Sequence, residues 1–184
     1  MKATGVVRRM DDLGRIVIPK EVRRTLRIRD GDPLEIYTDR DGEIIFKKYA
    51  PIGELGNYAK EYADALYEAT SHTACICDDR TVLAIAGGSK QLANQAIGPL
   101  AEQTLEKGET LVINLDRGFQ ENDAPILAPR DIISQYSSAA VAPILVAGEP
   151  GGCVLLLGKD AQMGDIEKKL CETAANFLAK QLER

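Results

Sequence analysis

The stretch Asp11-Asp12-Leu13-Gly14-Arg15-Ile16-Val17-Ile18-Pro19 decides the fold of the first 50 residues. Its acids and its glycine are typical of a turn, and short β-rich runs stand on both sides of them, at 4–9 and 15–18. The pattern therefore predicts a hairpin or a strand pair. Pro19 suits the first position of a helix, where its missing N–H is not needed, so a short helix is expected to follow at once.

This predicted helix, residues 20–26, has a strongly cationic face. Side chains at spacing i, i+3, i+4 and i+7 share one face of a helix. Four cations occupy such positions, namely Lys20, Arg23, Arg24 and Arg27. Like charges at this spacing repel each other, so the cluster indicates that an anion normally neutralises it.

Two further strands are predicted at 34–38 and 43–48, on either side of the hairpin signal Asp41-Gly42. Four short strands and little helix within about 50 residues bury too little apolar surface for comfortable stability. We therefore expect this module to form a homodimer by pairing strands between two chains.

The net charge of −5 hides a basic beginning and an acidic remainder. Residues 1–29 carry nine Lys and Arg against three Asp and Glu, a net charge of +6, while residues 51–184 carry eleven against nineteen, a net charge of −8. The basic module favours a polyanion as its partner, although a solvated charged surface would have the same composition. With 45% hydrophobic and 28% charged residues, the chain is not of the disordered or fibrous class.

From residue 51 onward, helical and strand patterns alternate. Pro51-Ile52-Gly53 marks a boundary between two predicted domains, 1–50 and 51–184, and a linker helix is expected at 54–70. The remaining elements are strands at 73–77, 82–86, 110–115, 138–147 and 153–158, a helix at 89–107 with a break at Gly98-Pro99, a final helix from 165, a long loop at 116–131 and a turn at 148–152. The short connections exclude most parallel crossovers, so the fold class is α+β with a mainly antiparallel sheet.

Apolar stripes run along the linker helix and the final helix. They contain Leu55, Tyr62 and Leu66 on the first, and Ile166, Leu170 and Phe177 on the second. Such stripes usually pack on their own domain. The alternative is that they join two dimers into a homotetramer.

Four segments carry a resemblance to a known family. They are Thr4-Gly5-Val6-Val7-Arg8, the stretch from Asp11 to Pro19, Glu21-Val22-Arg23-Arg24-Thr25-Leu26, and Leu34-Glu35-Ile36-Tyr37. In this order they closely resemble the N-terminal domain of the AbrB-type transition-state regulators. The resemblance implies a swapped-hairpin β-barrel homodimer that binds double-stranded DNA.

The family's DNA-contacting arginines occupy positions that match Arg8, Arg15, Arg23 and Arg24 here. An arginine fork suits phosphate or the O6 and N7 atoms of guanine. Further cations are expected to attract phosphates, which gives affinity without sequence information. They are Lys2, Arg9, Lys20 and Arg27. Because no recognition helix is evident, we expect DNA shape to carry part of the specificity.

Because an acidic second domain follows, the whole chain resembles sporulation regulators that join an AbrB-type domain to a GAF-like domain. The AbrB-type domain, residues 1–50, is called the head below. The resemblance implies control of gene expression in the developing forespore of a spore-forming bacterium. GAF-like domains often hold a small ligand, so a pocket is expected near residues 116–136. The alternative is a domain that only oligomerises.

The four cysteines, Cys75, Cys77, Cys153 and Cys171, leave an enzyme alternative open, because some GAF-like domains reduce oxidised methionine with cysteines. Cys75 and Cys77 share one face of a strand, which suits buried, reduced thiols better than a disulfide. His72 is the only histidine and no second cysteine pair stands at zinc spacing. We therefore predict no catalytic residue, no metal and no cofactor.

An antitoxin is a further alternative, because related swapped-hairpin dimers serve that role. Their C-terminal tails are short, whereas 134 residues follow Ala50 here. No apolar run approaches the roughly 20 residues that a bilayer requires, and residues 1–9 lack the apolar core of a secretory signal. We therefore expect a cytoplasmic protein with no membrane partner.

Overall fold

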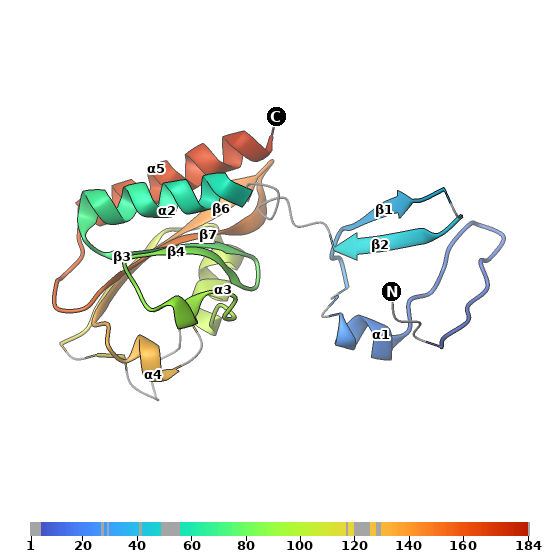
Figure 1. Cartoon of the computed structure of the whole chain (residues 1–184), viewed down its shortest axis with the longest axis horizontal. Coiled ribbons are helices and arrows are strands. Elements are labelled where there is room, and N and C mark those ends of the chain that lie inside the picture. Colours follow the sequence, from blue (N-terminus) through green and yellow to red (C-terminus); the bar gives the residue numbers. More distant parts are fainter. Residues whose placement is uncertain are drawn as a thin grey trace. The chain divides into compact units, whose positions relative to one another are not determined.

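The computed structural model describes residues 5–26, 28, 30–40, 42–48, 56–116, 118–119, 126–127 and 130–183. The chain divides into two compact units, Met1–Tyr49 and Ala50–Arg184. Figure 1 shows a small unit with one hairpin and one short helix, and a larger unit in which helices lie on both faces of a sheet. Each unit is described by itself.

The N-terminal unit contains helix α1 (Lys20–Thr25) and strands β1 (Leu34–Thr38) and β2 (Ile44–Lys48). The helix begins directly after Pro19, which is its N-cap residue. The two strands form an antiparallel hairpin in which Ile36 lies opposite Phe46. These elements agree with the helix and the second strand pair predicted from the sequence.

The first strand pair is absent from the described part of the single chain. Residues 5–10 and 15–19 have no regular secondary structure. Two backbone hydrogen bonds close the turn between them, from Asp11 N to Arg15 O at 3.0 Å and from Gly14 N to Asp11 O at 3.1 Å. The prediction of strands at 4–9 and 15–18 is therefore wrong for the described residues of one chain, because beyond this turn no backbone hydrogen bond joins the two segments into a ladder. Residue 4 lies outside the described residues.

The N-terminal unit leaves its apolar side chains uncovered. No described residue of this unit is buried, and Val7 and Val17 are 87% and 73% exposed. One face of the hairpin carries Leu34, Ile36, Ile44 and Phe46, because alternate residues of a strand point to the same side. Ile36 on this face is 62% exposed. A single chain thus gives this unit no core.

The C-terminal unit is built on a five-stranded antiparallel sheet. Its strands are β3 (Thr73–Asp78), β4 (Val82–Ala86), β5 (Leu111–Asn114), β6 (Ser138–Val146) and β7 (Glu149–Gly158). They lie in the order β4-β3-β7-β6-β5, and every neighbouring pair is antiparallel. The α+β class with an antiparallel sheet is confirmed.

The β6–β7 hairpin turns earlier than the sequence predicts. Ala147 and Gly148 form the turn, with φ angles of +51° and +86°, and β7 begins at Glu149. A two-residue turn with two positive φ angles matches the twist of a hairpin, so no longer loop is needed. Pro150 fits within the strand beside a register shift at Ile144 and Leu145, where the ladder is already irregular.

Helices cover both faces of the sheet (Figure 1). On one face lie α2 (Gly56–Thr70) and α5 (Asp165–Leu182). On the other lie the short 3₁₀ helix η2 (Lys90–Leu92) and the helices α3 (Pro99–Lys107) and α4 (Arg130–Ile133). The linker helix predicted at 54–70 corresponds to α2, and residues 54 and 55 lie outside the described residues.

Strand periodicity separates two cores. Ile76 and Leu156 point to the core beneath α2 and α5, whereas Cys75 and Leu155 point to the opposite core. The first core is rich in alanine, with Ala63, Ala74, Ala140, Ala174 and others fully buried, so both helices pack closely on the sheet. The second core is filled by larger side chains from η2, α3, α4 and the loops, including Leu92, Ile126 and Tyr136.

Candidate nucleic-acid interface and candidate pocket

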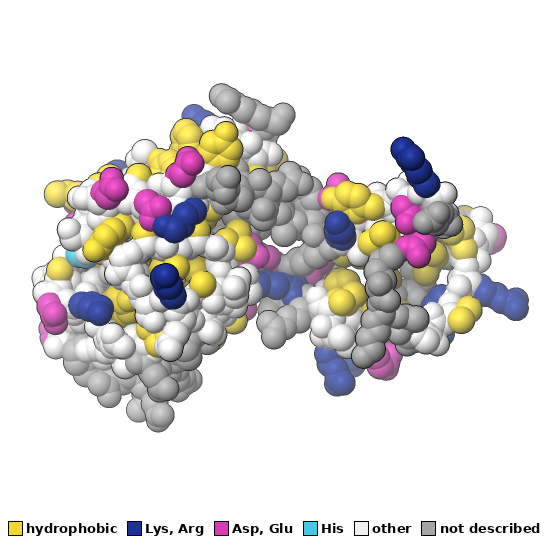
Figure 2. Space-filling model, in the orientation of Figure 1, with side chains coloured by type: hydrophobic (Ala, Val, Ile, Leu, Met, Phe, Trp, Pro, Cys, Tyr) yellow, Lys and Arg dark blue, Asp and Glu magenta, His cyan; other side chains and the backbone are white. Residues whose placement is uncertain are grey.

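The described cations predicted to bind DNA lie on three segments of the N-terminal unit, namely residues 5–10, residues 15–19 and helix α1. Arg8 and Arg9 are exposed in the irregular segment 5–10, and Lys20 and Arg24 are exposed on α1. Figure 2 shows Lys and Arg side chains projecting from the surface of this unit. Two further predicted cations, Lys2 and Arg27, lie outside the described residues.

Arg15 is held by the carboxylate of Asp11. Its Nε atom donates to Asp11 Oδ2 at 2.7 Å, while its backbone N–H donates to Asp11 Oδ1 at 2.8 Å. The same Oδ1 atom accepts the backbone N–H of Leu13 at 3.0 Å. The Arg15 side chain nonetheless remains 69% exposed, so most of its surface is open to a ligand.

Arg23 is held differently from its neighbour Arg24. Its Nη1 atom forms an ion pair with Asp30, and its Nε atom is buried without a hydrogen-bond partner among the described residues. Arg24 is exposed on the same short helix. The helical spacing places both cations on one face, but the local structure divides them into a half-buried, tethered side chain and a free surface side chain.

Sequence reasoning missed the acids that hold these arginines. Asp11 was interpreted only as a turn residue, although an acid four residues before Arg15 is a recognisable pairing signal in a tight turn. Asp30 stands seven residues after Arg23 and beyond the end of α1, so no helical spacing rule connects them. Opposite charges inside a basic module thus have a structural role.

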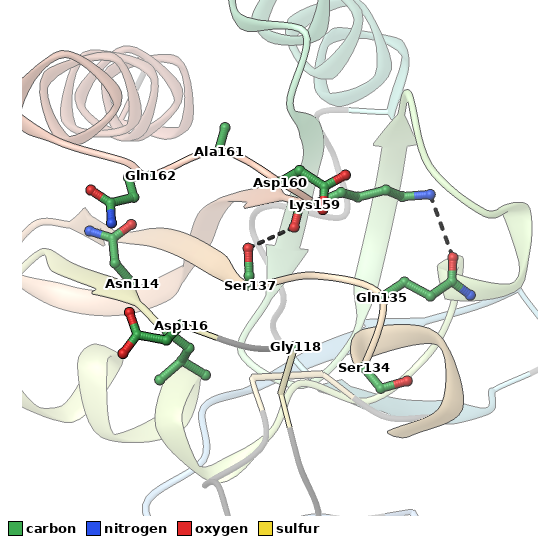
Figure 3. A pocket seen from close by; sticks show the side chains of 11 residues that line it. Asn114, Asp116, Gly118, Ser134, Gln135, Ser137, Lys159, Asp160, Ala161 and Gln162 are labelled. Atoms are coloured by element: carbon green, nitrogen blue, oxygen red, sulfur yellow. Dashed lines mark hydrogen bonds between the residues drawn. The ribbon is translucent and has the colours of Figure 1, made fainter.

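The C-terminal unit has a polar pocket of about 520 Å³ at the end of the sheet (Figure 3). It is formed where β5 ends, where β6 begins and where the segment after β7 returns toward α5. Its lining includes Asn114, Asp116, Ser134, Gln135, Lys159 and Asp160. The pocket predicted near residues 116–136 partly coincides with this one, and 117, 120–125 and 128–129 lie outside the described residues.

Side-chain hydrogen bonds hold the wall of this pocket in place. Asn114 binds Met163 twice, donating from Nδ2 to the carbonyl at 2.8 Å and accepting the backbone N–H at 2.7 Å. Ser137 donates to the carbonyl of Lys159 at 2.6 Å. Figure 3 shows Lys159 extended toward Gln135, with 3.5 Å between Nζ and Oε1. The pocket therefore presents hydroxyl, amide, carboxylate and ammonium groups on a fixed frame.

The cysteines are placed for packing. All four are free and buried, and Cys77 lies opposite Cys153 in the β3–β7 ladder. Burial raises the pKa of Cys75 above its ordinary value and that of Cys171 to about 12, while a hydrogen bond with Cys153, followed by burial, raises the pKa of Cys77. Because the thiolate is the nucleophile, these groups are poorly suited to redox catalysis.

The described residues contain neither a cluster of metal ligands nor a membrane-spanning helix. Within the ranges that the structure describes, no three His, Cys, Asp or Glu side chains gather as metal ligands would. The helices described are all too short or too polar to cross a bilayer.

Comparison with known proteins decides the family. The family model described as stage V sporulation protein T C-terminal, transcription factor, matches residues 54–183. The chain belongs to this family. It is 50% identical over 186 residues to stage V sporulation protein T of Bacillus subtilis (strain 168), with 100% of both chains covered. The expected relationship to sporulation regulators is thereby confirmed.

The N-terminal unit has relatives of its own. Residues 7–53 match the model described as antidote-toxin recognition MazE, bacterial antitoxin. The transition state regulatory protein AbrB of Bacillus subtilis (strain 168) is 63% identical over 51 residues, which cover 28% of this chain and 52% of that protein. The resemblance of the first 50 residues to AbrB-type regulators is therefore confirmed.

The C-terminal unit has the GAF fold. The GAF domain of an Acinetobacter phosphoenolpyruvate-protein phosphotransferase superimposes with a TM-score of 0.58 at 14% identity, covering 72% of this chain and 87% of that one. At this identity the likeness shows the fold alone. It therefore carries no argument for the methionine-reducing activity of some GAF-like domains.

Proposed function

We propose that the protein is a DNA-binding transcription regulator of sporulation whose N-terminal unit binds double-stranded DNA as a homodimer. The whole-chain match to a sporulation transcription factor carries the proposal. The exposed cations Arg8, Arg15 and Arg24 support it, because they offer guanidinium groups to phosphates or to guanine. We further propose that it acts in the developing forespore.

The uncovered apolar surface of the N-terminal unit supports the dimer. Segments 5–10 and 15–19 have β-rich sequences but no strand partner, and the hairpin face around Ile36 is exposed. A second copy of the same unit would supply both the missing ladders and the missing core. Pairing two heads would also double the cationic surface that the DNA meets.

The proposed roles of the cations follow their surroundings. Arg8, Arg15 and Arg24 contact DNA directly, and Arg23 both contacts DNA and fixes the end of α1 through Asp30. Arg9 and Lys20, together with Lys2 and Arg27, attract phosphates.

Arg24→Ala tests this assignment. In fluorescence anisotropy with a duplex selected from a random pool by the wild-type protein, we expect the variant to bind about ten- to a hundredfold more weakly, since a good arginine contact contributes about 1–3 kcal/mol. The matched control is Arg40→Ala, which removes another exposed arginine of the same unit, at a position that matches none of the family's DNA-contacting arginines. We expect a change of less than about threefold there.

Equal losses in both variants would mean that only net charge matters, and the residue assignment would fail. Binding too weak to measure in the wild-type protein, even at low salt, would overturn the DNA-binding function itself.

We also propose that the polar pocket of the C-terminal unit binds a small polar molecule that regulates the head. Lys159 supplies a cation at its rim, and Asn114 and Ser137 keep the wall in shape.

Thermal-shift measurements with free amino acids, carboxylic acids and nucleotides are expected to identify a compound that raises the melting temperature by a few degrees, because a ligand of the native state stabilises it. Lys159→Gln should abolish that shift, while the control Lys107→Gln on α3 should preserve it. Identical shifts in both variants would exclude this pocket.

A further inference from the structure

The turn at Asp11 joins an acid to an arginine within the basic N-terminal module. Asp11 lowers the positive charge that a phosphate would meet, which is unfavourable for simple electrostatic attraction. The acid is nevertheless bound three times by its neighbours, through Leu13 N, Arg15 N and Arg15 Nε. Its place in the surface therefore needs a reason other than charge.

These bonds fix Arg15 at its backbone amide and at the Nε atom of its guanidinium group. Asp11 Oδ1 holds its backbone amide at 2.8 Å, and Oδ2 holds Nε at 2.7 Å. Gly14, with φ +75°, allows the chain to turn back so that one carboxylate reaches both atoms. The long side chain of Arg15 is thereby ordered before any ligand arrives.

The bond to Nε also selects which edge of the guanidinium remains available. With Nε occupied, Nη1 and Nη2 form the edge that can meet two acceptors, such as O6 and N7 of guanine or two phosphate oxygens. The side chain is 69% exposed, so that edge is accessible. The hydrogen bonds from the backbone and side chain of Arg15 hold the pKa of Asp11 below its ordinary value, so the carboxylate is charged at neutral pH.

We infer that Asp11 is a specificity-determining positioning residue, which orders the Arg15 fork for one arrangement of DNA acceptors at the expense of general attraction to phosphate. The inference rests on the proposed DNA-binding function. It predicts that the neutral variant loses discrimination between DNA sequences without losing affinity for DNA in general.

Asp11→Asn is the informative substitution. Asparagine keeps an oxygen for the N–H groups of Leu13 and Arg15 and is itself favoured in turns, so the backbone is retained. With that oxygen in the place of Oδ1, the amide nitrogen stands in the place of Oδ2 and offers Arg15 Nε a donor instead of an acceptor. Asp12→Asn is the matched control, because it makes the same charge change one residue away, and Asp12 forms no hydrogen bond with another described residue.

The experiment compares the full-length proteins on a duplex selected by the wild type and on a shuffled duplex. We expect Asp12→Asn to strengthen binding to both by a similar factor. We expect Asp11→Asn to leave or strengthen binding to the shuffled duplex and to weaken binding to the selected one, so that their ratio falls about three- to tenfold. In an Arg15→Ala background, Asp11→Asn should no longer change the ratio, since the acid acts through that arginine.

Arginine Nε–H resonances of the free protein supply a readout without DNA. We expect a protected Nε–H signal for Arg15 in the wild type and in Asp12→Asn, and its loss in Asp11→Asn. Equal sequence discrimination by the two asparagine variants would overturn the inference while leaving DNA binding intact. A wild-type protein that binds neither duplex would remove the proposed function and this inference together.

Discussion

Ile36→Asn is expected to separate the two N-terminal units of the proposed dimer and to weaken DNA binding by more than a hundredfold. Ile36 is 62% exposed in the single chain and lies opposite Phe46 on the apolar face of the hairpin. Burying one such side chain contributes about 1.5–3 kcal/mol. A symmetric dimer buries this side chain twice, so the substitution weakens the free energy of dimerisation by about 3–6 kcal/mol. The dissociation constant of the dimer rises by about 10²- to 10⁴-fold.

Tyr37→Asn is the matched control for this prediction. Tyr37 is the next residue on the same strand and points to the opposite face, where its hydroxyl donates to Glu35 at 2.5 Å and Lys47 lies 4.5 Å from its ring centroid. Both variants place asparagine in the middle of β1, so their effects on strand propensity are similar. Sedimentation and anisotropy should show dissociation and loss of binding for Ile36→Asn alone. If both variants remain assembled and bind DNA normally, the hairpin face is not the dimer interface.

The sequence and the structure agree best where one chain supplies all the partners of an element. The apolar runs 138–147 and 153–158, on either side of a turn, predict two paired strands, and β6 and β7 are paired along their length. The same is true of the hairpin at 34–38 and 44–48. Their hydrogen-bonding partners lie close in the sequence, so local patterns suffice to predict them.

Agreement ends where a partner lies elsewhere. The runs at 4–9 and 15–18 have strand-like composition, but strands depend on a ladder that the single chain does not supply here. The acid that tethers Arg23 likewise comes from beyond the helix, at Asp30. Composition identified the cations, whereas the side chains that constrain them could be found only in three dimensions.

The turn of the large hairpin shows a further limit. Gly148, Pro150, Gly151 and Gly152 all favour a loop by their residue type, and the prediction placed the turn across 148–152. Two residues with positive φ are sufficient to reverse the chain, so most of that segment joins β7. Register with β3 and β6 on both sides of β7 outweighs the local preferences of proline and glycine.

Phe177→Asp is expected to divide the proposed homotetramer of the full-length protein into dimers. Phe177 on α5 is 42% exposed, and its ring lies 5.1 Å from that of Tyr62 on α2. Ile166 and Tyr58, also on these two helices, are 72% and 61% exposed. Figure 2 shows hydrophobic side chains at the surface over α2 and α5. The opposite sides of both helices already pack on the sheet, so we propose that this outer surface joins two dimers.

Phe177→Asp should weaken DNA binding only on a duplex that two dimers can bind together. Linking two binding events commonly raises overall affinity by about 10²-fold or more, so Phe177→Asp should lose about that factor on a duplex with two sites and almost nothing on a duplex with one. Asn176→Asp adds the same charge at the exposed neighbouring position, about a quarter of a turn around α5, and should keep both the tetramer and the two-site affinity. A tetramer that survives Phe177→Asp in sedimentation would show that another surface joins the dimers. A loss of binding to the single-site duplex would instead mean that the substitution damages the fold, because the head that contacts DNA contains none of these residues.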